Sequence, residues 1–210
     1  LIGIFILSYQ DALIKLIADN TTFWQLQLIR SFFNITFLIL IVIYLKNIRL
    51  LFPKNWKPVL LRGTMMVLCM FCFFSASPIL TLSQMAAGLY TFPIFVTIMS
   101  IFISKEMVGK YRLIALLIGL IGSLFILQPW EDTFNRYQFL PILAGFFYAC
   151  NIILIRKHCR NESPISLTFI VGILFFVSGM LGVFFFELVF NFNQNSNLNF
   201  ILQGWVELIF

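Results

Sequence analysis

The chain has 210 residues, of which 61% are hydrophobic and only 10% are charged, and its mean hydropathy is +0.99. A soluble domain carries about 25% charged residues and about 45–50% apolar ones. The few charged residues of this chain cannot cover the surface of a water-soluble protein. Disorder, collagen, a coiled coil and a nucleic-acid-binding domain are excluded, although the formal net charge is +6. The composition indicates an integral membrane protein.

Long apolar segments follow one another along the chain. A membrane-spanning helix needs about 20 apolar residues to cross a hydrocarbon core about 30 Å thick. By that criterion we expect seven spans, followed by part of an eighth that begins near Phe200 and stops at Phe210. Helices fit better than barrel strands because the segments do not alternate between apolar and polar residues. The seven predicted spans are Leu1–Ala18, Phe23–Leu45, Val59–Ile79, Leu82–Ser104, Arg112–Gln128, Phe139–Arg156 and Ile165–Phe186.

Two boundaries need a separate argument. The run Val59–Ser104 is nearly unbroken, but as one helix it would be roughly 69 Å long at 1.5 Å per residue. We therefore expect a turn at Ser77-Pro78. The first span lacks the basic start and the cleavage site of a signal peptide. Because the chain has no initiator Met and stops within a span, we expect it to be a fragment of a longer protein.

The loop charges predict the orientation. Counting Lys and Arg between successive spans gives 0, 5, 0, 3, 1, 3 and 0, so eleven of the fourteen basic residues fall on one side. Cytoplasmic loops carry the excess of basic residues, which predicts a cytoplasmic N-terminus. The basic balance is then a topology signal and requires no nucleic-acid partner. The five basic residues of the second loop are Lys46, Arg49, Lys54, Lys57 and Arg62.

The chain contains a weak internal repeat, and the predicted topology strengthens it. At an offset of 142, Gly3–Lys15 aligns with Gly145–Lys157, and five spans separate the copies. The two copies therefore cross the membrane in opposite directions, and inverted repeats of this kind are typical of secondary transporters. We expect an all-α bundle of inverted five-helix repeats, ten spans when complete. The first repeat is placed at residues 1–129 and a truncated second repeat at 137–210.

Several segments, in this order, resemble a known family. SYQDALIK, QLIRSFF, LLRG, LYTFPIFVTIMSIFISKE and GLIGSLFILQP are similar to the drug/metabolite transporter superfamily, in particular its EamA-type carriers. LLRG with the P-x-F…K-E closure, and ILAGFFYACNIILIRK…ESPIS in the second repeat, look most like its S-adenosylmethionine carriers. The resemblance implies a transporter in a bacterial inner membrane. Its substrate would be S-adenosylmethionine or an amino-acid-like compound, with a drug or amino-acid exporter of the same fold as the alternative.

Ionisable residues within the first two spans are the leading candidates for a substrate site. Such residues cost about 2.5–3.5 kcal/mol at the centre of a span and usually face a cavity or a partner. Asp11 and Lys15 share a helix face at i, i+4. Gln27, Arg30 and Asn34 form a polar stripe with Ser31. Arg30 would bind an anionic group such as a carboxylate bidentately, and Asp11 would bind a cation or neutralise Lys15.

A purely structural interpretation of these charges stays open. Asp11 and Lys15 could form an ion pair that packs helices, and Arg30 could extend to the outer headgroups. The charges are one-sided, because the offset of 142 places Gly172 opposite Arg30 and Ile153 opposite Asp11. An ion pair required by the repeat fold would not be one-sided. We therefore favour a binding role for Arg30.

Spans four and six offer further candidates. Gln84 and Tyr90 could add a second wall, together with Thr91, while Gly88 and Pro93 would flex the helix and free its carbonyl groups. Tyr148 and Asn151 are spaced i, i+3 and are the polar positions of span six. Ordinary packing is the alternative for each of these residues.

Other classes of protein fit less well. The single His lies in a basic loop, and no H-E-x-x-H, G-x-S-x-G or P-loop motif is present, so an enzyme is the more distant alternative. A seven-helix receptor disagrees with the cytoplasmic N-terminus, a channel lacks a filter or a charge ring, and a scaffold leaves the charged stripes unexplained. Cys69 and Cys72 form a C-x-x-C inside an apolar run and are interpreted as buried hydrophobes. We expect no cofactor or metal, a small metabolite and the bilayer as partners, and a homodimer as a possible assembly.

Overall fold

The computed structural model describes residues 22–77, 79–104, 109–127 and 136–189, and in these ranges all regular structure is helical. The first predicted span, with Asp11 and Lys15, lies outside them, as does the partial eighth span. Five apolar segments are long enough to cross a membrane, which confirms the expectation of an all-α polytopic membrane fold. The helices are α2 (Phe23–Tyr44), α3 (Trp56–Ser75), α4 (Leu82–Leu89), α5 (Phe92–Ser104), α6 (Lys110–Leu127), α7 (Phe139–His158) and α8 (Pro164–Val189), with short 3₁₀ turns at Ile48–Leu51 and Arg136–Gln138.

Two of the predicted spans differ from the structure. Span three begins at Trp56 rather than Val59 and ends at Ser75. Lys57 and Arg62, both counted with the second loop, therefore lie within α3, although the predicted span Val59–Ile79 already contained Arg62. Span four is one segment long enough to cross a membrane, as predicted, but it consists of two helices, because α4 ends at Leu89 and α5 begins at Phe92.

The break in span four has a local cause. Proline has no N–H, so Pro93 cannot donate the i→i−4 hydrogen bond to the carbonyl of Leu89. The neighbouring turn is closed instead by Thr91, whose backbone N–H donates to the Gly88 carbonyl at 3.2 Å and whose Oγ1 donates to the same oxygen at 2.7 Å. The pair α4 and α5 still forms one segment long enough to span a membrane.

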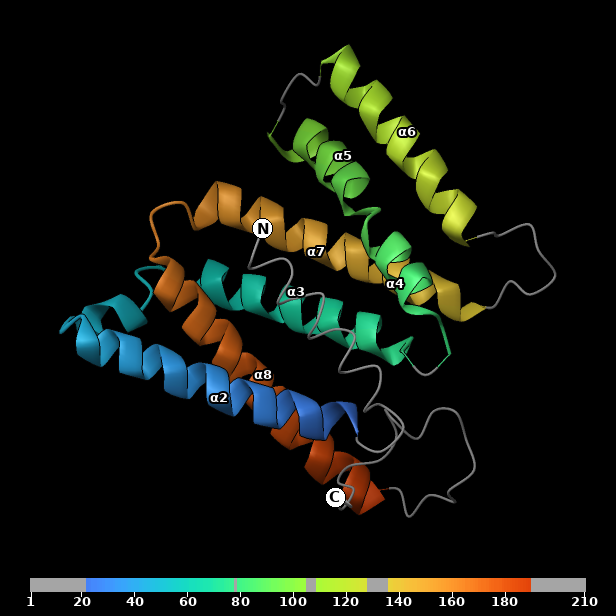
Figure 1. The fold of residues 1–210 in the computed structure, drawn as a ribbon. Helices are drawn as coiled ribbons and strands as arrows, with labels where there is room; N and C mark the ends of the chain where they lie inside the picture. The colour runs from blue at the N-terminus through green and yellow to red at the C-terminus, as the bar shows by residue number, and fades with distance from the viewer. Residues whose placement is uncertain (1–21, 78, 105–108, 128–135, 190–210) are drawn as a thin grey trace.

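Helices α2 and α8 pack closely and in opposite directions (Figure 1). A Cβ added at Gly179 would lie 3.1 Å from the backbone nitrogen of Leu28 and 3.2 Å from the carbonyl oxygen of Trp24, and one at Gly172 would lie 3.1 Å from Ile35. As residue numbers rise along α2 they fall along α8. Small residues let helix backbones approach each other in membranes. The glycines of α8 therefore allow α2 and α8 to pack closely.

The centre of the bundle is formed by α3 and α7. These helices run antiparallel in Figure 1, with α4 and α5 beside α7, α6 farther out, and the α2–α8 pair on the other side of α3. The main core cluster joins the ends of α2 and α3 to α4 and α7. Its buried members are Phe23, Cys69, Cys72, Phe73, Phe74, Ala76, Leu80, Met85 and Ala144.

Candidate functional site

The predicted stripe on α2 is divided between buried and exposed positions. The side chains of Gln27 and Ser31 are buried, at 4% and 2% exposure, while Arg30 is half-buried and Asn34 is exposed. The Ser31 hydroxyl donates to the Gln27 carbonyl at 2.5 Å. Because α2 packs chiefly on α8, the stripe does not lie at the seam between α3 and α7.

Of the candidates in span four, Gln84 makes hydrogen bonds at the start of α4. Gln84 forms a capping box with Thr81: its backbone N–H donates to Thr81 Oγ1 at 3.3 Å, and its Oε1 accepts from the Thr81 N–H at 3.1 Å. This reciprocal pair fixes the start of α4. Tyr90 follows the last residue of α4, and 68% of its surface is exposed. Gln84 thus has a local structural role, and a wall formed with Tyr90 stays a prediction.

Gly88 and Pro93 flank the break between α4 and α5, where flexing was expected. Gly88 is also a point of close packing, since an added Cβ would lie 2.5 Å from the Cβ of Pro141 on α7. On the facing helix, a Cβ at Gly145 would lie 2.9 Å from Thr91 Oγ1 and 3.0 Å from the Leu89 carbonyl oxygen. Two glycines thus allow the broken span to pack directly on the backbone of α7.

The two candidates on α7 lie near the seam with α3. Asn151 is 3% exposed, and its Oδ1 accepts a hydrogen bond of 2.9 Å from Arg62 Nε. Its amide nitrogen lies 3.8 Å from the sulfur of Met66. One turn away, the ring of Tyr148 meets that of Phe92 edge to face at 5.0 Å. Asn151 thus makes a buried polar contact between α3 and α7.

Arg62 is the residue that the sequence argument missed. Its Nη1 donates to the backbone carbonyl of Leu167 on α8 at 3.1 Å, in addition to the bond from Nε to Asn151. We call Arg62, Asn151, Met66 and the Leu167 carbonyl the Arg62 network. The signal was present in the segment LLRG, because the apolar residues on both sides of Arg62 continue the helix.

The Arg62 network can hold three helices together in an apolar setting. A buried polar group is costly unless it is hydrogen-bonded, and here one guanidinium satisfies a side-chain amide and a main-chain carbonyl at once. Hydrogen bonds to a charged group contribute about 1.5–3 kcal/mol each. Both acceptors are neutral, so neither of them compensates the positive charge of the guanidinium. Among the described residues, no group of three His, Cys, Asp or Glu side chains is placed to hold a metal ion.

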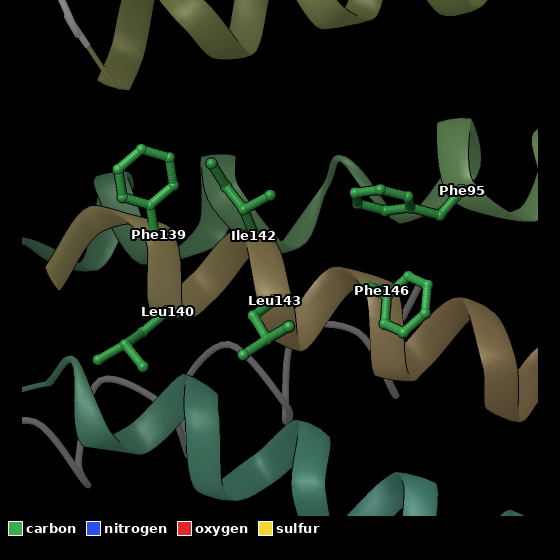
Figure 2. A pocket seen from close by; sticks show the side chains of 6 residues that line it. All are labelled: Phe95, Phe139, Leu140, Ile142, Leu143 and Phe146. Atoms are coloured by element: carbon green, nitrogen blue, oxygen red, sulfur yellow. The ribbon is translucent and has the colours of Figure 1, made fainter. Parts of the chain in front are cut away.

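An apolar groove runs along the other side of α7. It has a volume of about 530 Å³ and is lined entirely by apolar side chains. Figure 2 shows Phe95 of α5 facing Phe146 of α7, and their rings meet edge to face at 5.7 Å. None of the predicted site residues lines this groove, and its lining side chains carry no polar group to recognise a polar solute. The lining residues are Phe95, Phe139, Leu140, Ile142, Leu143 and Phe146.

The apolar spans and the buried polar network define a polytopic helical membrane protein. Residues 1–128 match the model of the EamA-like transporter family, and the chain belongs to that family. This confirms the resemblance to EamA-type carriers and the expectation of a multi-pass membrane protein.

Individual relatives are also transporters by name. The chain is 42% identical over 81 residues to a riboflavin transporter of Vibrio cholerae, a match that covers 39% of this chain and 27% of the relative. It is 25% identical over 183 residues to an S-adenosylmethionine uptake transporter of Rickettsia bellii, covering 82% and 61% respectively. The corresponding protein of Rickettsia prowazekii is 25% identical over 167 residues, covering 80% and 56%. The chain thus spans less than two thirds of each relative, and no solved structure matches it.

Proposed function

We propose that the full-length protein is a secondary carrier that moves a small organic metabolite across the bacterial inner membrane by alternating access. The observation that carries this proposal is the Arg62 network. It joins α3, within the matched family segment, to α7 and α8, which follow that segment. In transporters built from inverted repeats, one repeat rocks against the other around a site near the midplane. Polar contacts across that seam fit such a motion.

S-adenosylmethionine is the first substrate to test. The relatives of that name align with about four fifths of the chain. S-adenosylmethionine has a carboxylate and cationic groups, which suit a cavity containing both Arg30 and Asp11. Arg30 would bind the carboxylate bidentately. The remaining substrate-binding residues of the proposal are Lys15, Gln27, Asn34, Gln84, Tyr90, Tyr148 and Asn151.

Riboflavin is the second candidate, because the match to a riboflavin transporter has the higher identity, although over a shorter segment. The two substrates differ in what they require of the protein. Riboflavin is uncharged and would depend on ring contacts such as those of Tyr148 and Phe92. Its binding would therefore depend little on Arg30.

Ligand-dependent stabilisation of the purified full-length protein separates these candidates. A ligand at 100 times its Kd stabilises the folded state by about 2.7 kcal/mol. We expect S-adenosylmethionine to raise the unfolding temperature, Arg30→Ala to abolish the rise, and Arg49→Ala, which removes an exposed arginine, to preserve it. A rise with riboflavin alone would overturn the first substrate. No rise with either compound or with a panel of amino acids would overturn the substrate class.

A further inference from the structure

Two loops are tied together at one end of the bundle. The loop between α2 and α3 lies beside the loop between α7 and α8 (Figure 1). Glu162 of the second loop accepts hydrogen bonds from two successive backbone N–H groups of the first. Its Oε2 lies 2.8 Å from the nitrogen of Lys54, and its Oε1 lies 2.9 Å from that of Asn55.

The Glu162 carboxylate caps the N-terminus of α3. Asn55 occupies the N-cap position of α3, but its side chain makes no capping hydrogen bond. Negative groups are favoured at a helix N-terminus, where backbone N–H groups lack partners and the helix dipole is positive. Glu162 supplies that charge from a segment 107 residues away. The contact is exposed, so water can replace it when the loops separate.

Deeper in the same end, the Arg62 network forms a second connection. Arg62 follows the first residue of α3 by six positions, which corresponds to about 9 Å along the helix. Val59, at 0% exposure, lies between these two levels along α3 and belongs to an apolar cluster with Cys159, which is 2% exposed. Leu167 and Ile170 of α8 complete its buried part. The end is thus closed by an outer carboxylate, an apolar layer and an inner guanidinium.

We propose that Glu162, the Val59–Cys159 cluster and the Arg62 network together form the closed gate of the carrier on this side of the membrane. The proposal rests on the proposed function, because only an alternating-access carrier must open and close each side. Both polar connections join α3, or the loop before it, to the segments from α7 onward. Rocking of one half against the other therefore breaks them together. The basic loops at this end are those expected in the cytoplasm, which makes it the cytoplasmic gate.

Cys159 is a native reporter for this gate. Burial raises the pKa of its thiol, the positive charge of Arg62 lowers it, and the Glu162 carboxylate raises it. Labelling by a maleimide requires both exposure of the sulfur and formation of the thiolate. Loss of the Glu162 charge alone would move the labelling curve to lower pH. Opening of the gate would raise the plateau that the rate reaches at high pH.

The experiment measures this plateau in the full-length protein in membranes, with Cys159 as its sole cysteine. We expect Glu162→Ala, which removes both acceptors, to raise the plateau about tenfold. Glu162→Gln keeps one oxygen acceptor and should produce a smaller rise. Asn161→Ala changes the neighbouring exposed residue and should leave the plateau unchanged. Equal plateaus in all four proteins would overturn the gate, even if the labelling curves moved along the pH axis.

A second reporter separates opening from unfolding. Cys69, at 1% exposure, belongs to the main core cluster, and as the sole cysteine it should stay unlabelled in every gate variant. Labelling of Cys69 in the Glu162→Ala variant would mean that this protein unfolds, and Glu162→Gln then decides the matter: a raised plateau supports the gate, and an unchanged one overturns it. The measurement needs no substrate. A failed gate therefore leaves the proposed transport intact, and absence of transport leaves the labelling result interpretable.

Discussion

Replacing Gly88 by alanine tests whether close helix packing, rather than free flexing, explains this glycine. The added Cβ would lie 2.5 Å from Pro141 Cβ, 3.2 Å from the Pro141 carbonyl carbon and 3.3 Å from the nitrogen of Ile142, whereas ordinary contacts lie at 3.4–4 Å. The shortest contact therefore falls about 1 Å short, against a ring that cannot rotate away. Because two of the three neighbours are backbone atoms, α4 and α7 must separate.

The net change in the stability of the Gly88→Ala protein combines two opposing contributions. Overpacking of a core costs typically about 1–3 kcal/mol, while alanine is favoured over glycine in a helix by about 0.8–1.0 kcal/mol. We expect Gly88→Ala to lose about 1 kcal/mol of stability, or up to about 2 kcal/mol if the helices cannot adjust. A loss of this size lowers the melting temperature of a chain of this length by several degrees.

The control is an exposed glycine in another helix. Gly119 of α6 has no atom within 4 Å of an added Cβ, so Gly119→Ala should be neutral or slightly stabilising. Thermal unfolding of both variants in detergent, followed by the loss of monodisperse protein, compares them directly. If Gly88→Ala proves as stable as Gly119→Ala, the packing argument is refuted. The interpretation of Gly88 as a point where the helix flexes would then be preferred.

Three further predictions concern the helix seams and the topology. In a double-mutant cycle, Arg62→Ala and Asn151→Ala should each destabilise the protein by about 1–3 kcal/mol, with a coupling energy of at least about 0.5 kcal/mol; independent effects in thermal unfolding would contradict the hydrogen bond. Gly179→Leu should separate α2 from α8 and lower the yield of folded protein, and a normal yield with an unchanged melting temperature would rule out their close approach. Single cysteines in Asp19–Thr22 should be labelled from outside the cell and those in Asn47–Lys57 from inside, whereas the reverse pattern would overturn the orientation.

The sequence predicted the spans because length and hydropathy are local properties. The predicted boundaries of α2 and α7 lie within two residues of those observed. Gly88 and Pro93 also indicated where span four would loosen, but the break itself requires a neighbouring helix on which the two halves can pack. Nothing local in the sequence indicates that Gly145 lies opposite Leu89 and Thr91.

The polar contacts were predicted less well because partners are tertiary information. Asn151 was selected for its polarity, but its partner lies 89 positions away. Arg62 was counted with the loop charges although the predicted span contained it, and a count of charges does not show which basic residue has a partner within the bundle. Glu162 was noticed only as part of a family-like segment. Its capping of α3 requires two loops to meet, which no spacing rule reveals.

Tracer counterflow in proteoliposomes tests the central claim of transport most directly. Vesicles containing the full-length protein would be loaded with unlabelled S-adenosylmethionine and diluted into labelled compound, with riboflavin and amino acids in parallel. The account predicts transient accumulation of labelled S-adenosylmethionine, its loss with Arg30→Ala and its retention with Arg49→Ala. Accumulation that is unaffected by Arg30→Ala would contradict the proposed site. Absence of exchange for every compound would contradict the proposed carrier of these metabolites.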